Sequence, residues 1–179
     1  TRILSSAASD VYKRQAVAYL NSLRQILVYS GVSDADMEKG QMRCDVNVSV
    51  RPNDQTELGT KIELKNLNSV SAVRRSLHYE IDRQIEELEA GNTIVQATWR
   101  WNDEVGQTEI MRTKEDAHDY RYFPDPDLLP VQTTEILARV QQDLPELPHQ
   151  KVERFESDYK ITHYDASVLA SEQVLADFY

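Results

Sequence analysis

The ten residues from Met42 to Arg51 alternate between apolar and polar side chains without a break. Successive side chains of a β-strand point to opposite faces of a sheet, so this run predicts a two-faced strand. The apolar residues are Met42, Cys44, Val46, Val48 and Val50, and the polar residues are Arg43, Asp45, Asn47, Ser49 and Arg51. Two guanidiniums, a carboxylate, an amide and a hydroxyl on one face are groups that bind metal ions and phosphates.

A second stretch, residues 61–65, repeats the pattern. Ile62 and Leu64 are its apolar residues, Lys61, Glu63 and Lys65 are its polar ones, and Asn66 and Asn68 follow. The connecting residues 52–59 are polar and few enough to close a hairpin. Burial of both apolar faces would then place both polar faces on the same side of the sheet. Such a patch suits Mg²⁺ and phosphate chemistry.

Asp45 is the first candidate for a Mg²⁺ ligand, because Arg43 and Asn47 flank it on its own face. The alternative is an ordinary surface ion pair. Glu63 is the second acidic candidate, and Lys61 and Lys65 could hold phosphate oxygens. An alternating Lys-Glu-Lys run also protects an edge strand from aggregation, which is the competing interpretation.

Further ligand roles follow from the same two strands. Arg43 and Arg51 could hold a phosphoryl group or a substrate carboxylate through two N–H donors each. The residues expected to bind a cofactor are Asn47, Ser49, Arg51, Lys65 and Asn66. An asparagine shortly before a helix is, however, more often a cap.

Composition sets the class of protein. The chain has 179 residues, 40% hydrophobic and 28% charged, and no apolar run near the roughly 20 residues of a membrane span. Its one cysteine, Cys44, excludes a disulfide within the chain and favours the reducing cytoplasm. The net charge of −10 argues against non-specific nucleic-acid binding. Residues 1–75 nevertheless hold 11 Lys and Arg against 8 Asp and Glu, so the polar strands lie in the basic part.

Helices should position these strands. Apolar spacing predicts a helix at 16–30 and another after Asn68 or Ser69, with Val73, Leu77, Ile81, Ile85 and Leu88 as its buried stripe and Gly91 at its end. Residues 93–101 and 108–113 are predicted to form two more strands, so the sheet would have at least four strands arranged as hairpins. A helix is expected at 134–143, and helices again from His149. Residues 1–15 share no pattern with the rest, and we expect them to be a foreign leader.

Three blocks of this sequence, 39–51, 59–69 and 119–128, closely resemble the B-subunit family of the bacterial and organellar aspartyl/glutamyl-tRNA amidotransferases. The resemblance implies an α+β fold: residues 16–145 would be the C-terminal part of a glutamine synthetase-like cradle with an antiparallel sheet and packed helices. Residues 146–179 would begin an all-α helical domain.

The resemblance also implies a function. A protein of this family works with subunits A and C as a heterotrimer on Glu-tRNA(Gln) or Asp-tRNA(Asn). With ATP and Mg²⁺ it phosphorylates the side-chain carboxylate, which ammonia from glutamine then converts to the amide. In that setting Asp45, Arg43, Lys61 and Glu63 are the expected catalytic residues, with Asp45 and Glu63 as metal ligands.

Two departures from the family pattern stand out. The usual Gln-Glu-Thr-Arg reads Gln96-Ala97-Thr98-Trp99 here, so any role of that Glu or Arg is lost or taken by neighbours. The family's Gly-Leu-Glu-Val-His segment, which supplies metal ligands, does not occur, so we expect the isolated chain to be inactive. The alternatives are a non-catalytic docking module for tRNA or assembly, and the archaeal-type enzyme specific for Glu-tRNA(Gln).

Overall fold

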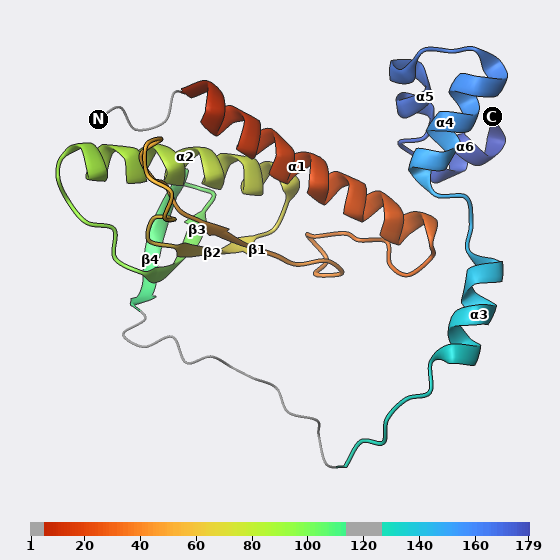
Figure 1. The fold of residues 1–179 in the computed structure, drawn as a ribbon, viewed down its shortest axis with the longest axis horizontal. Helices are drawn as coiled ribbons and strands as arrows, with labels where there is room; N and C mark the ends of the chain where they lie inside the picture. The colour runs from red at the N-terminus through yellow and green to blue at the C-terminus, as the bar shows by residue number, and fades with distance from the viewer. Residues whose placement is uncertain (1–5, 114–126) are drawn as a thin grey trace. The chain divides into compact units, whose positions relative to one another are not determined.

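The computed structural model describes residues 6–113 and 127–179. The chain forms two compact units, the first from residues 1–24 and 34–115 and the second from 25–33 and 116–179. The fold class is α+β as expected, with a four-stranded sheet and packed helices (Figure 1). Residues 114–126, which include most of the third block of resemblance, lie outside the described residues.

The sheet of the first unit has the strand order β1 (Cys44–Val48), β2 (Ile62–Leu67), β3 (Ala97–Asn102) and β4 (Gln107–Thr113). The pairs β1–β2 and β3–β4 are antiparallel hairpins, as the sequence predicted. The β2–β3 pair is parallel, so the expectation of an antiparallel sheet was wrong at this one pairing. The helix α2 (Val70–Glu89) runs between β2 and β3 and returns the chain to the end of the sheet where β2 begins.

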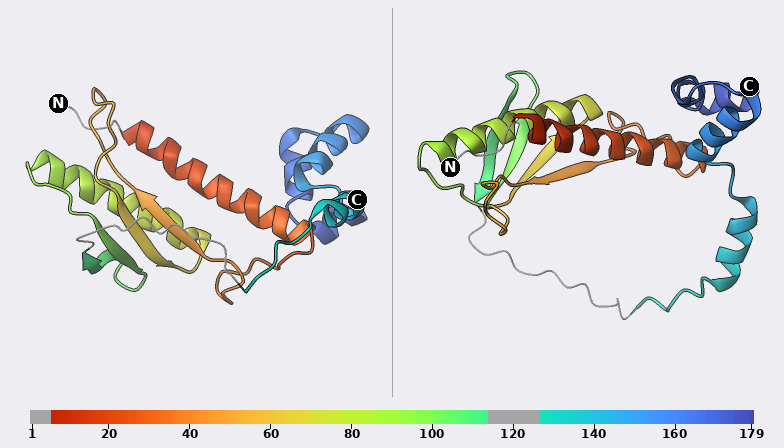
Figure 2. Two further views of the ribbon diagram at one scale, coloured as in Figure 1. Left: turned by 60° about the horizontal axis from the view of Figure 1, so that its bottom comes forward. Right: turned by 45° about the horizontal axis from the view of Figure 1, so that its top comes forward.

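Helix α2 covers one face of this sheet (Figure 2). Ser69 is its N-cap and accepts a hydrogen bond of 3.0 Å from the amide of Ala72. The predicted stripe packs inward: Val73, Leu77 and Ile81 are buried, and Val50 packs on Ile81 with Val48, Ile85 and Leu88 around them. Gly91 follows the last turn with a φ of +83°, a conformation that glycine adopts without strain.

Helix α1 (Ser6–Tyr29) starts earlier than the sequence indicated. We expected it at 16–30, and the C-terminal limit differs by one residue. The interpretation of residues 1–15 as a foreign leader stays a prediction.

The second unit is helical over its described residues, with α3 (Thr134–Asp143), α4 (Pro148–Tyr159), α5 (His163–Leu169) and α6 (Gln173–Phe178). Its core consists of Tyr29, Phe155, Ala166 and Ala176. The hydroxyl of Tyr29 donates to the carbonyl of Ala170 over 2.9 Å. The predicted domain boundary between 145 and 146 stays a prediction. Within the described residues we find no helix that is both long and apolar enough to cross a membrane.

Candidate functional site

The face of the sheet opposite α2 carries the polar side chains that the alternating sequence predicted. Ile62 and Leu64 are fully buried, whereas Asp45 and Asn47 are exposed and Glu63 and Lys65 are half-buried. We call this surface the polar face, and its residues are Asp45, Asn47, Glu63, Lys65, Thr98, Arg100, Asn102 and Glu109. The antiparallel β1–β2 hairpin therefore gathers residues from both polar strands on one side.

Lys65 lies at the centre of this face. Its Nζ is 2.7 Å from Oδ2 of Asp45 and 3.2 Å from Oε1 of Glu63. The hydrogen bond to Asp45 is the largest cause of a raised Lys65 pKa. The second oxygen of Glu63 accepts a bond of 3.0 Å from Oγ1 of Thr98. The structure thus joins the two predicted metal ligands through one ammonium group.

Asn66 has a conformation that the sequence did not predict. In the β1–β2 ladder Cys44 pairs with Leu67 but Val46 pairs with Leu64, so Lys65 and Asn66 form a β-bulge opposite Asp45. Asn66 has a φ of +63°, in the left-handed region that asparagine tolerates better than most residues. Its Nδ2 donates to the carbonyl of Trp101 over 3.1 Å. This hydrogen bond connects β2 to the end of β3. The role of Asn66 in binding a ligand stays a prediction.

The other predicted site residues lie at the ends of the two strands, because β1 and β2 are shorter than the alternating runs. Arg43 precedes β1 and Lys61 precedes β2, and both are exposed. Ser49 and Arg51 follow β1 and are half-buried. Asn47 is the register partner of Glu63. Of the predicted set, the residues within the paired strands β1 and β2 are therefore Asp45, Asn47, Glu63, Lys65 and Asn66.

Sequence reasoning missed the part of the polar face that β3 and β4 contribute. Nε and Nη2 of Arg100 donate to Oε2 of Glu109 over 2.8 and 2.6 Å, and Nδ2 of Asn102 donates to Oε1 over 2.7 Å. The hydrogen bond from Asn102 is the largest cause of a lowered Glu109 pKa, and the hydrogen bond from Arg100 adds to it. The alternation of Thr98, Arg100 and Asn102 with two tryptophans was the signal that could have found them.

A hollow of about 330 Å³ opens beside these residues. It is lined by Asn66, Arg100, Trp101, Asn102, Asp103 and Glu104. Arg75 neutralises Asp103 at 2.8 Å, and Nε1 of Trp101 donates to the same carboxylate over 2.6 Å. Asn66, the residue after Lys65, is the one lining residue that comes from β2.

A polar network is buried between α2 and the sheet, and sequence analysis assigned it no role. Glu80 is fully buried; Oε1 accepts bonds from Arg83 and Gln84, and Oε2 from Arg83 and Thr108. Gln84 in turn accepts the amide N–H of Val50 over 3.1 Å. The spacing of Ser76, Glu80 and Gln84, four residues apart beside the apolar stripe, was the available signal. The network fixes the end of the β1 segment on α2.

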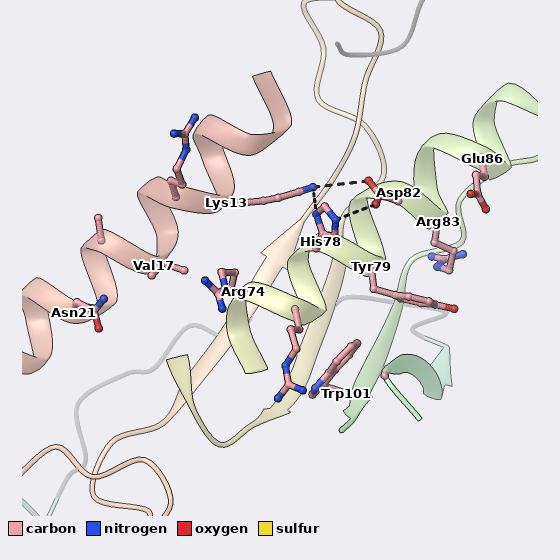
Figure 3. A pocket seen from close by; sticks show the side chains of 14 residues that line it. Lys13, Val17, Asn21, Arg74, His78, Tyr79, Asp82, Arg83, Glu86 and Trp101 are labelled. Carbon is pink, nitrogen blue, oxygen red and sulfur yellow. Dashed lines mark hydrogen bonds and ion pairs between the residues drawn. The ribbon is translucent and has the colours of Figure 1, made fainter. Parts of the chain in front are cut away.

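A groove of about 1090 Å³ lies between α1 and α2 (Figure 3). Nζ of Lys13 lies 2.6 Å from Nδ1 of His78 and 3.8 Å from Asp82 across this groove. Lys13 and Arg14 fall within the segment that we expect to be foreign, so we assign the groove no function.

The polar face offers one feature of a magnesium site, which is a pair of neighbouring carboxylates. Mg²⁺ is usually held by one or two carboxylates together with phosphate oxygens and water. Asp45 and Glu63 supply two carboxylates around one cation, Lys65. Over residues 6–113 and 127–179 no group of three His, Cys, Asp or Glu side chains is placed to hold a metal. The metal role of both carboxylates stays a prediction.

Comparison with known proteins places the chain in a family. Residues 4–139 match the family model described as the GatB/GatE catalytic domain. The B subunit of the aspartyl/glutamyl-tRNA(Asn/Gln) amidotransferase of Methylacidiphilum infernorum is 59% identical over 92% of this chain and 34% of its own length. Proteins with the same name from Thermoanaerobacter sp. and Thermodesulfovibrio yellowstonii are 57% and 48% identical, over 92% and 93% of this chain and 35% of their own lengths.

This chain spans about a third of the length of those relatives. The family model covers well over half of the chain, and the matched residues include both strands that carry Asp45, Glu63 and Lys65 as well as α2, β3 and β4. The chain therefore belongs to the GatB/GatE catalytic domain family.

Proposed function

We propose that this chain is part of the B subunit of a tRNA-dependent amidotransferase, a ligase that acts as a complex with subunits A and C. Its substrates would be Glu-tRNA(Gln) or Asp-tRNA(Asn), with ATP and Mg²⁺. Family membership and the names of the relatives support this proposal. The observation that carries it is the contact of Lys65 with both Asp45 and Glu63 on one face of the sheet.

The reaction needs an activated carboxylate. An oxygen of the substrate side chain forms a bond to the γ-phosphorus of ATP, the bond from that phosphorus to ADP breaks, and ADP leaves. The nitrogen of ammonia then bonds to the acyl carbon, phosphate leaves with the electrons of the C–O bond, and the nitrogen loses a proton. Mg²⁺ would supply charge neutralisation for the phosphates.

The chain's own residues would bind and orient the reacting groups. Asp45 and Glu63 would hold the metal, which would replace the ammonium group that they now share. Lys65, released from the carboxylates, could then turn to a phosphate oxygen, as could Arg43, Arg51 and Lys61 at the strand ends. Asn47, Ser49 and Asn66 would complete the polar surface around the nucleotide.

The test uses the full-length protein assembled with subunits A and C, with Asp45 or with Asp45→Asn. We expect the substitution to abolish ATP-dependent amidation of Glu-tRNA(Gln), while glutamine hydrolysis and tRNA binding remain. Asp54→Asn, in the exposed loop between β1 and β2, is the matched control and should leave amidation unchanged.

Two other outcomes would contradict the proposal. Near-normal amidation by the Asp45→Asn complex would remove Asp45 from the site. Loss of tRNA affinity with unchanged turnover at saturating tRNA would instead favour a docking role for this face.

A further inference from the structure

Arg100 lies directly beside the lysine at the centre of the polar face. In the parallel β2–β3 ladder Arg100 is the register partner of Lys65. Neighbouring strands are about 4.8 Å apart, and register partners point to the same face. A group bound by Arg100 would therefore lie next to a group bound at Lys65.

The guanidinium of Arg100 is held in a defined direction. Glu109 accepts from Nε and Nη2 through one oxygen, and Asn102 holds the other oxygen of the same carboxylate. Within the described residues, Nε and Nη2 are the atoms of Arg100 whose N–H groups have hydrogen-bond partners. An arginine has five N–H donors in total. The Arg100 side chain is 55% exposed, so the remaining donors are accessible to a ligand. Their planar arrangement matches a carboxylate or phosphate.

The hollow that Arg100 lines has charges of both signs. Arg100 and the amides of Asn66 and Asn102 supply N–H donors, and Glu104 supplies an exposed carboxylate. Asp103 contributes less negative charge, because Arg75 and Trp101 already bind it. A ligand that carries a carboxylate and an ammonium group would satisfy both sides. A volume of about 330 Å³ leaves room for a group of amino-acid size.

We propose that Arg100, positioned by Glu109 and Asn102, binds the side-chain carboxylate of the acidic aminoacyl group, with Glu104 facing its α-ammonium. This inference rests on the proposed function and names a subsite for its substrate. The position is chemically consistent, because phosphoryl transfer requires the carboxylate to lie beside the phosphate-binding groups. Arg100 is thus a substrate-binding residue, and Glu109 is a positioning residue.

The experiment compares the complete three-subunit complex with its Arg100→Gln and Arg100→Lys variants. We expect Arg100→Gln to raise KM for Glu-tRNA(Gln) about tenfold or more and leave KM for ATP unchanged, because a charge-assisted hydrogen bond is lost. Arg100→Lys, which keeps the charge without the planar donors, should recover part of that loss. Arg24→Gln, an exposed arginine of α1, is the control for net charge and should leave both KM values unchanged.

A binding measurement separates this role from a structural one. The wild-type complex should bind Glu-tRNA(Gln) more tightly than the uncharged tRNA, and Arg100→Gln should remove that difference without changing the affinity for uncharged tRNA. Glu109→Gln should weaken the preference partially, since Arg100 remains but is less firmly oriented.

Other results would overturn the subsite. If Arg100→Gln left the preference for charged tRNA intact, Arg100 would not bind the aminoacyl group. If KM for ATP rose instead, the anion at Arg100 would be a phosphate of the nucleotide. A wild-type complex without any amidation would refute the proposed function, whereas an active wild type with an unaffected variant would refute only the subsite.

Discussion

The guanidinium of Arg83 lies over the indole ring of Trp99, 4.4 Å from its centroid. The same guanidinium donates to both oxygens of the buried Glu80, over 3.0 and 2.6 Å. The family resemblance implies an arginine where this chain has Trp99, and the guanidinium that contacts the Trp99 ring comes from α2. Among the described residues, Nε1 of Trp99 is a buried donor without a hydrogen-bond partner. The contact with the Arg83 guanidinium, rather than a hydrogen bond from Nε1, therefore holds the indole ring of Trp99.

Replacing Glu80 by alanine should destabilise the chain strongly. Glu80 is fully buried and holds Arg83, Gln84 and Thr108, so its removal leaves their donors without an acceptor. Breaking a buried ion pair on one side typically costs about 3–5 kcal/mol. Urea unfolding of the chain and of Glu80→Ala measures this loss. Glu89→Ala, an exposed change on the same helix, should cost less than about 0.5 kcal/mol, and an equally small loss for Glu80→Ala would contradict the network.

Gly59→Ala should strain the base of the β1–β2 hairpin. A Cβ at this position would lie 2.0 Å from the carbonyl oxygen of Val50, which is backbone and cannot rotate away. Overpacking of this kind costs about 1–3 kcal/mol. We expect a lower free energy of unfolding and faster hydrogen exchange of the Val50 amide, whose acceptor is Gln84. Thr60→Ala, at the next residue, which is exposed, is the control. If Gly59→Ala had the same free energy of unfolding as Thr60→Ala, the hairpin would accommodate the added Cβ without strain.

The thiol of Cys44 should react slowly at mildly alkaline pH. Burial is the main cause that raises the pKa of Cys44 above its ordinary 9.0, and the charge of Asp45 adds to it. Because the thiolate is the reacting form, modification by a disulfide reagent at about pH 8 should be slower than for an unstructured cysteine peptide. Asp45→Asn should raise the rate modestly. A rate equal to that of the peptide would show that the pKa is not raised.

Glu109 should titrate below its ordinary pKa of 4.5, because hydrogen bonds from Asn102 and then Arg100 favour the carboxylate. A lowered folded-state pKa contributes stability that is present above 4.5 and is lost as the pH falls through the folded value. NMR titration of the side-chain carboxyl carbon measures it directly. Asn102→Ala should move the pKa upward, and Arg100→Gln should do so to a smaller extent. A midpoint at 4.5 in the unsubstituted chain would refute both contacts in solution.

The sequence by itself determined the elements whose signal is local. The alternation in 42–51 and 61–65 indicated which residues are buried, and Ile62, Leu64 and Val50 are buried. The spacing of Val73, Leu77 and Ile81 indicated the inner side of α2, and Ser69 was one of its two expected caps. These features depend on residues one to four positions apart, so the periodicity of strand and helix is visible along the chain.

Tertiary structure decided which distant residues meet. The parallel β2–β3 pairing makes Lys65 and Arg100 register partners. The bulge formed by Lys65 and Asn66 places these two residues opposite Asp45. Sequence analysis assigned Glu80 no role, yet its carboxylate accepts hydrogen bonds from Thr108 of β4 and from Arg83. A charged side chain has no local signal for its partner, because the partner comes from another strand or helix and its identity depends on register. For that reason the sequence predicted the candidates Asp45, Glu63 and Lys65, while the fold joined them and added Arg100 and Glu109.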